Sequence, residues 1–176
     1  SDAAACLLAL NKLWELNIGP KELCALGLEL GADVPVFIYG KNAWAEGVGE
    51  QLQPLQLPEK WYFVIHPQIF VSTAQIFSAQ GLTRDCHPIK IRAFLEGQGK
   101  NVCEEVACNL YPEIERALKW LAQFAPSRMT GTGACVFAAF NSKSEAEEVQ
   151  SRLPQSWLGF VAKSLTGNPV VQACIE

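Results

Sequence analysis

Asp33 is the only acidic residue in the segment 31–37, where it lies between Gly31 and an apolar run that contains Pro35. A carboxylate at the edge of an apolar segment loses hydration, so it usually has a partner or a chemical role. One such role is to accept a proton from a reacting hydroxyl group. The alternative is structural, since an aspartate in a Gly-Ala-Asp turn commonly hydrogen-bonds the nearby backbone. These residues alone leave both roles open.

A second candidate is the run of Thr130, Gly131, Thr132 and Gly133, which precedes the apolar segment 134–140. Glycines that alternate with threonines can present backbone N–H groups and hydroxyls to an anion. A Gly-x-Gly sequence before a strand can equally be only a tight turn. The neighbouring Arg128 could pair with a phosphate or simply lie on the surface.

Ser1 and Asp2 are the third candidate, because both are good capping residues and an Ala- and Leu-rich helical pattern follows them. A helix N-terminus presents unpaired N–H groups to phosphate, although simple capping explains the same residues. Phosphoryl transfer needs donors for the phosphates, a carboxylate for the attacking hydroxyl and a metal ion brought with the nucleotide. The sequence shows no ligand set for that ion, and we assign no metal-binding residue.

The composition narrows the class of protein. An apolar content of 49%, a charged content of 18% and a net charge of −4 indicate a globular protein and disfavour nucleic acid or an anionic membrane as partners. No apolar run approaches the roughly 20 residues of a bilayer span. The seven cysteines are odd in number and form no Cys-x-x-Cys pair, which indicates a reducing compartment, and we expect the cytoplasm.

Hydrophobic periodicity and breaker residues predict an α+β fold with helices on one side of a sheet. We expect strands at 34–39, 43–52, 61–65, 134–140 and 157–162. We expect helices at 3–16, 20–30, 73–80, 88–96, 101–109 and 112–125, and one more with a capping box of Ser144 and Glu147. A boundary near residue 57 would divide the chain into domains 1–56 and 57–176.

Three motifs together resemble the GHMP superfamily of small-molecule kinases. They are Ser1–Ala5, then Gly31–Phe37 followed by Ala45–Glu50, and Pro126–Phe137. The resemblance extends over nearly the whole chain. It implies that 1–56 is the remnant of the family's N-terminal, nucleotide-binding lobe and that 57–176 is its ferredoxin-like α/β sandwich.

Within the superfamily, the motifs are most similar to the kinases of the non-mevalonate isoprenoid pathway that use ATP and Mg²⁺. The resemblance implies phosphorylation of the 2-hydroxyl of a CDP-linked methylerythritol, with Asp33 as the catalytic base. It implies that phosphate is bound by Ser1, Asp2, Thr130, Gly131, Thr132 and Gly133. Val48 would line the substrate site and Phe77 would stack on the cytosine ring. The alternative for Phe77 is a core position in a short helix, and Ala74 stands where the family usually has proline.

The resemblance also implies that a partner lysine and most of the glycine-rich nucleotide loop lie upstream of Ser1. We therefore expect the 176 residues to be part of a longer chain and to have no appreciable kinase activity alone. As partners we expect the small-molecule substrate and ATP, and we allow for a homodimer. Two alternatives remain: another GHMP kinase, acting on a mevalonate-type, homoserine or sugar substrate, or a non-catalytic α+β module that binds an anion.

Overall fold

The computed structural model describes residues 1–86, 89–95 and 97–175. These residues form two compact units, which we describe separately. The first contains Ser1–Glu59 together with Leu165–Glu176, and the second contains Lys60–Ser164. Residues 165–176 thus pack with the first unit, whereas the predicted boundary placed them in the domain 57–176. That assignment of family domains stays a prediction.

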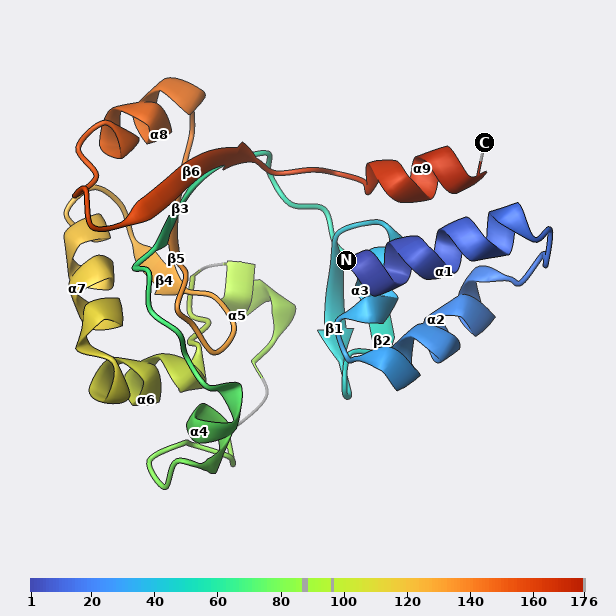
Figure 1. Cartoon of the computed structure of the whole chain (residues 1–176), viewed down its shortest axis with the longest axis horizontal. Coiled ribbons are helices and arrows are strands. Elements are labelled where there is room, and N and C mark those ends of the chain that lie inside the picture. Colours follow the sequence, from blue (N-terminus) through green and yellow to red (C-terminus); the bar gives the residue numbers. More distant parts are fainter. Residues whose placement is uncertain (87–88, 96, 176) are drawn as a thin grey trace. The chain divides into compact units, whose positions relative to one another are not determined.

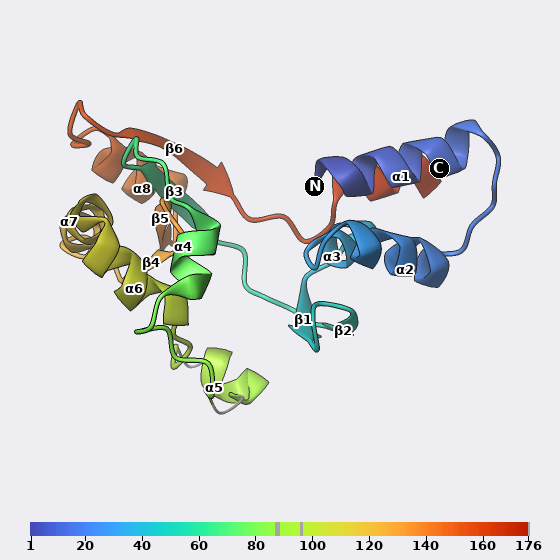
Figure 2. The same cartoon turned by 60° about the horizontal axis from the view of Figure 1, so that its bottom comes forward.

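The first unit is mainly helical and carries a small hairpin. It contains α1 (Asp2–Leu13), α2 (Pro20–Leu30), α3 (Val34–Tyr39), β1 (Ala43–Glu46), β2 (Gln51–Pro54) and α9 (Pro169–Ile175). The helix α1 contacts α2, α3 and α9. The helix α9 lies beside α1 in Figure 1 and is partly hidden behind it in Figure 2. A small core of Ala4, Leu8, Leu23, Val34 and Ile38 joins α1, α2 and α3.

Residues 34–39 form the helix α3, so the strand predicted there is wrong. Pro35 fits the first helical turn, where a missing N–H breaks no hydrogen bond. Gly40 ends the helix in the left-handed conformation with φ 72°. Val34 and Ile38 are four residues apart, so a helix buries both on one face against α2. This burial decides the conformation.

Residues 43–54 form a hairpin, so the single strand that we predicted at 43–52 is wrong. The strands β1 and β2 pair antiparallel, with Glu46 opposite Gln51. Gly47 and Gly49 reverse the chain with φ 71° and φ 115°, a conformation that glycine adopts readily. The Glu50 carboxylate accepts the Val48 N–H at 2.8 Å and closes the turn.

The second unit contains a four-stranded antiparallel sheet in the order β4-β5-β3-β6 (Figure 1). Its strands are β3 (Trp61–His66), β4 (Ser127–Met129), β5 (Val136–Phe140) and β6 (Leu158–Lys163). Phe63 pairs with Ala138 on one side and with Val161 on the other. Alternate residues on β3 and β5 are buried, which gives the sheet one core-facing side.

Helices supply the other half of this core. They are α4 (Thr73–Ser78), α5 (Ile91–Leu95), α6 (Val102–Leu110), α7 (Pro112–Leu121) and α8 (Lys143–Gln150). The helix α7 packs on β4 and β5, and α8 packs on β3 and β6. Buried residues of α6, α7 and α8 join those of the sheet in one cluster. The predicted α+β fold, with helices on one side of the sheet, is confirmed.

Several element boundaries differ from the prediction. The cap of α8 is Ser142, whose Oγ accepts the Glu145 N–H at 3.2 Å, so the predicted cap was two residues late. Within the predicted helix 88–96 the structure describes α5, while residues 88 and 96 lie outside the described residues. The strand β4 and the helix α9 were not predicted. In the described ranges, no helix has the length and apolar character to cross a membrane.

Candidate functional site

Asp33 occupies the N-cap position of α3, directly after α2 has ended at Gly31. Its side chain is exposed and makes no hydrogen bond or ion pair with any described residue. The expected loss of hydration is therefore wrong, because the chain turns inward only at Val34 and Pro35. The turn alternative is not supported either, since the carboxylate caps no backbone N–H. A hydrated, unpartnered carboxylate is free to accept a hydrogen bond from a ligand.

The β1–β2 turn lies against the backbone beside Asp33. A Cβ atom placed on Gly49 would be 2.3 Å from the carbonyl oxygen of Ala32. Only glycine allows this approach, because φ at this position is 115° as well. Val48, the preceding residue, is 68% exposed. Two predicted site residues, Asp33 and Val48, are thus held close to one another within the first unit.

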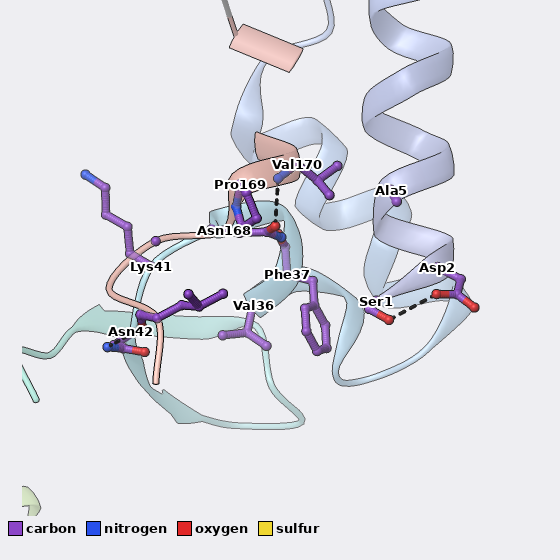
Figure 3. Close-up of a pocket in the computed structure, with 13 residues that line it drawn as sticks. Ser1, Asp2, Ala5, Val36, Phe37, Lys41, Asn42, Asn168, Pro169 and Val170 are labelled. Carbon is purple, nitrogen blue, oxygen red and sulfur yellow. Dashed lines mark hydrogen bonds between the residues drawn. The ribbon is translucent and has the colours of Figure 1, made fainter. Parts of the chain in front are cut away.

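Ser1 and Asp2 line a pocket of about 510 Å³ in the first unit (Figure 3). Its other walls are Ala5 of α1, the middle of α3 at Val36 and Phe37, residues 40–42, Leu165 and residues 167–170. The Ser1 hydroxyl donates to Asp2 Oδ1 at 3.1 Å and caps no N–H group of α1. Lys41 is the only basic residue among the described lining residues, and Asp33 does not line the pocket. The structure therefore does not bring Ser1 and Asp2 into one pocket with Asp33.

The loop 130–133 is part of the connection between β4 and β5 in the second unit. The Thr130 N–H donates to Cys135 O at 3.0 Å, and the Gly133 N–H donates to Thr130 O at 3.0 Å. The N–H groups of Gly131 and Thr132 have no partner among the described residues. Two adjacent free N–H groups in a loop with positive φ at Gly131 can bind an anion.

Phe77 lies on α4 and is 56% exposed, whereas the neighbouring Ile76 is fully buried. The core alternative for Phe77 is therefore wrong. The hydroxyls of Thr73 and Thr132 lie 3.1 Å apart, which joins the start of α4 to the loop 130–133. The second unit thus brings the loop 130–133 close to the helix that carries Phe77.

Sequence reasoning missed two side chains that hold these elements. The Tyr111 hydroxyl accepts the Ser72 N–H at 3.3 Å and donates to Gln75 Oε1 at 2.7 Å, which fixes α4. The Asn101 side chain donates to the carbonyls of Met129 and Gly131. Asn101 could have been recognised as a capping residue before an apolar pattern. Its contact with a loop about thirty residues away has no signal in a single sequence.

The titratable groups near the loop 130–133 and the β1–β2 turn give little support for a cysteine nucleophile or a metal site. Burial raises the pKa of the Cys103 and Cys135 thiols, so both remain protonated and weakly nucleophilic at neutral pH. Hydrogen bonds from its own backbone N–H, from Val48 N–H and from Gln51 lower the pKa of the Glu50 carboxyl. The described residues contain no group of three His, Cys, Asp or Glu side chains able to hold a metal ion.

Comparison with known proteins identifies the family. Residues 1–41 match the model of the GHMP kinases N terminal domain, and residues 89–158 match the GHMP kinases C terminal model. Together these matches cover more than half of the chain. The chain belongs to the GHMP kinase family. This confirms the resemblance seen in the sequence motifs.

Two curated relatives of this GHMP kinase chain carry the same name. The 4-diphosphocytidyl-2-C-methyl-D-erythritol kinase of Nitrosococcus oceani is 58% identical over 176 residues, which are 100% of this chain and 62% of that relative. The enzyme of the same name from Hahella chejuensis is 53% identical over 97% of this chain and 59% of its own length. The chain therefore spans less than two thirds of the length of these relatives.

Solved structures agree with this assignment. A crystal structure of 4-(cytidine 5'-diphospho)-2C-methyl-D-erythritol kinase matches with a TM-score of 0.78 and 28% identity, over 92% of this chain and 63% of that one. Homoserine kinase from Cytophaga hutchinsonii matches with a TM-score of 0.63 and 15% identity, over 90% of this chain and 62% of that one. The second match shows a shared fold alone. Both support the GHMP kinase fold of the chain.

Proposed function

We propose that the protein containing this chain transfers the γ-phosphoryl group of ATP to the 2-hydroxyl of 4-diphosphocytidyl-2-C-methyl-D-erythritol, a step of the non-mevalonate isoprenoid pathway. The observation that carries this proposal is the 58% identity, over all 176 residues, with a kinase named for that substrate. In this proposal, residues 1–56 belong to the nucleotide-binding domain and residues 57–176 to the C-terminal domain. The seven free cysteines support a reducing compartment, the cytoplasm.

In this proposal Asp33 is the general base. Its exposed and unpartnered carboxylate can accept the proton of the attacking hydroxyl while that oxygen bonds to the γ-phosphorus and the bond to ADP breaks. Val48, in the turn that packs beside Asp33, would contact the sugar part of the substrate. Phe77 would stack on the cytosine ring, which its exposure favours.

The phosphates of ATP would be held by the loop Thr130–Gly133 and by the start of α1 at Ser1 and Asp2. The loop offers two free N–H groups and the helix offers its unpaired first-turn N–H groups. The described residues contain no group of three acidic, histidine or cysteine side chains that could hold a metal ion without the nucleotide. We propose that Mg²⁺ arrives bound to the nucleotide phosphates.

The test is a kinase assay with the complete gene product that contains these 176 residues. We expect ATP-dependent phosphorylation of 4-diphosphocytidyl-2-C-methyl-D-erythritol, which ³¹P NMR measures as a new phosphate resonance of the substrate. Asp33→Asn should lower kcat by about 10²- to 10⁴-fold and leave the Kd for ATP, measured by calorimetry, within a factor of three or so.

Two results would overturn the proposal. Faster turnover of homoserine, a mevalonate-type alcohol or a sugar would assign the protein to another branch of the GHMP kinases. Nucleotide binding with no turnover of any of these alcohols would indicate a binding module. A matched control is Asp85→Asn, which changes an exposed aspartate whose side chain forms no hydrogen bond or ion pair with the described residues and should leave kcat unchanged.

A further inference from the structure

We propose that Asn101 is a positioning residue, whose side-chain amide holds the loop Thr130–Gly133 in the conformation that binds the phosphates of ATP. The inference rests on the proposed function of this loop. Asn101 touches neither nucleotide nor substrate in this proposal and acts only through the loop.

The two ends of the Asn101 amide have separate partners. Its Oδ1 accepts the Cys103 N–H at 3.0 Å and caps the helix α6. Its Nδ2 donates to Met129 O at 3.1 Å and to Gly131 O at 2.7 Å. One side chain therefore fixes the start of a helix and two carbonyls on either side of Thr130.

Glu104, one helical turn further along α6, strengthens the same contact. Its Oε2 accepts the Met129 N–H at 2.8 Å. The first turn of α6 thus binds the backbone of Met129 by both its N–H and its carbonyl. Since α6 is itself anchored in the core through Cys103, Val106 and Ala107, the loop is held against a rigid element.

The contact with Gly131 O determines where the next N–H group points. In a planar trans peptide the carbonyl of one residue and the N–H of the next point in opposite directions. Asn101 holds Gly131 O toward α6, so the Thr132 N–H points away from α6, where the described protein offers no acceptor. An N–H group without a protein partner and with a fixed direction is preorganised for a phosphate oxygen.

Substitutions can separate this positioning from ordinary helix capping. Asn101→Ser keeps an oxygen that caps helices well, but it is too short to reach the two carbonyls and has no second donor. Asn101→Asp keeps the size and the capping oxygen, and it places a carboxylate against Met129 O and Gly131 O. The matched control is Asn109→Ser, an exposed asparagine on the same helix whose side chain has no hydrogen bond among the described residues.

The experiment measures steady-state kinetics and ATP affinity on the complete gene product. We expect Asn101→Ser to raise KM and Kd for ATP about ten-fold or more, with KM for the second substrate changed less than about three-fold. Asn101→Asp should raise the KM for ATP further, because a negative charge is added near the phosphates. Asn109→Ser should match the wild type. The thermal midpoint of Asn101→Ser should stay within about 4 °C of the wild type, since the cap is kept.

Three results separate the possible failures. Unchanged ATP affinity in Asn101→Ser, with an active wild type, would refute the role of Asn101 and leave the proposed function standing. A loss of ATP affinity that matches an equal loss of folded protein would reduce Asn101 to a capping residue and also refute it. A wild type that binds ATP without turnover would refute the proposed function alone, and the Kd values of the variants would still decide the role of Asn101.

Discussion

At the scale of single residues, Gly49 controls the position of the backbone next to Asp33. A side chain at Gly49 would meet the Ala32 carbonyl at 2.3 Å, and φ there is 115°. We expect Gly49→Ala to destabilise the fold by about 1–3 kcal/mol and to lower kcat about ten- to a hundred-fold through displacement of Asp33. Urea unfolding and kinetics of the complete gene product test this.

The control for this prediction is Gly81→Ala. A Cβ atom added to Gly81 would have no other atom within 4 Å, and Gly81 does not adopt a positive φ. Its substitution should change neither stability nor kcat. Equal behaviour of the two alanine variants would show that the approach of the turn to Ala32 has no role in placing Asp33.

The hydrogen bond that closes the β1–β2 turn depends on pH, because its acceptor is the ionised carboxylate of Glu50. Hydrogen bonds from its own N–H, from Val48 N–H and from Gln51 lower its pKa below the ordinary value of 4.5. A carboxylate with a lowered folded pKa stabilises the fold above its unfolded pKa, and this stabilisation is lost as pH falls through the folded pKa. We therefore expect the Val48 amide resonance to be constant above pH 5 or so and to shift as Glu50 is protonated below 4.5.

An NMR titration of the Val48 amide measures this transition. In Glu50→Gln the side chain cannot ionise, so the same amide should show no shift over this pH range. A midpoint at or above the ordinary value of 4.5 would contradict the prediction.

At the scale of elements, Asn168 connects the C-terminal segment 165–176 to α3 and its C-cap by hydrogen bonds (Figure 3). Its Nδ2 donates to Phe37 O at 3.0 Å, its N–H donates to Gly40 O at 2.8 Å, and its Oδ1 accepts the Val170 N–H at 3.0 Å. Asn168→Ala removes the two side-chain bonds and should destabilise the first unit by about 1–2 kcal/mol. Since Asp33 begins α3, kcat should fall as well.

Hydrogen exchange of the α3 amides measures this loosening directly. Gln56→Ala is the control, because Gln56 is exposed and its side chain has no hydrogen bond with the described residues. Protection of α3 that is equal in Asn168→Ala and the wild type would contradict the role of the C-terminal segment.

The elements also show how far a single sequence determines the fold. The strands β3, β5 and β6 and the helices α2, α6 and α7 were predictable, because their apolar periodicity and flanking Pro or Gly agree. The helix α3 was not, since a six-residue apolar run fits either state and only its packing against α2 decides. The short strand β4 carries a pattern too brief to recognise. It is long-range pairing with β5 that creates it.

The candidate site follows the same rule. The sequence alone was enough to select Asp33 and Thr130–Gly133 as candidate site residues. It did not predict the tertiary contacts around them. That Asp33 is exposed, that Gly49 touches Ala32, and that Asn101 holds Gly131 are all consequences of contacts distant in sequence. A motif predicts the chemistry of a residue, while tertiary structure determines which group positions it.

At the scale of the whole molecule, several large apolar side chains are exposed on α1, on α2 and in the segment between these helices. The helix α1 buries only Ala4 and Leu8, whereas Leu13 and Trp14 at its end are 73% and 62% exposed. Other exposed side chains of this region are Leu10, Leu16, Leu26 and Leu30. Contiguous apolar surface promotes association. We therefore expect the 176-residue chain to self-associate as its concentration rises, measured by size-exclusion chromatography with light scattering.

The variant Leu13→Lys with Trp14→Lys should shift the 176-residue chain toward monomer, because two charges would have to be buried in any complex through this surface. Phe70→Lys is the matched control, since Phe70 is 88% exposed in the second unit. Its substitution removes an exposed apolar side chain elsewhere and should leave association unchanged.

Because the curated relatives contain residues beyond those aligned here, we also expect this chain alone to show no kinase turnover. A strictly monomeric chain, or one that phosphorylates the CDP-linked substrate unaided, would show that these residues form a self-sufficient unit.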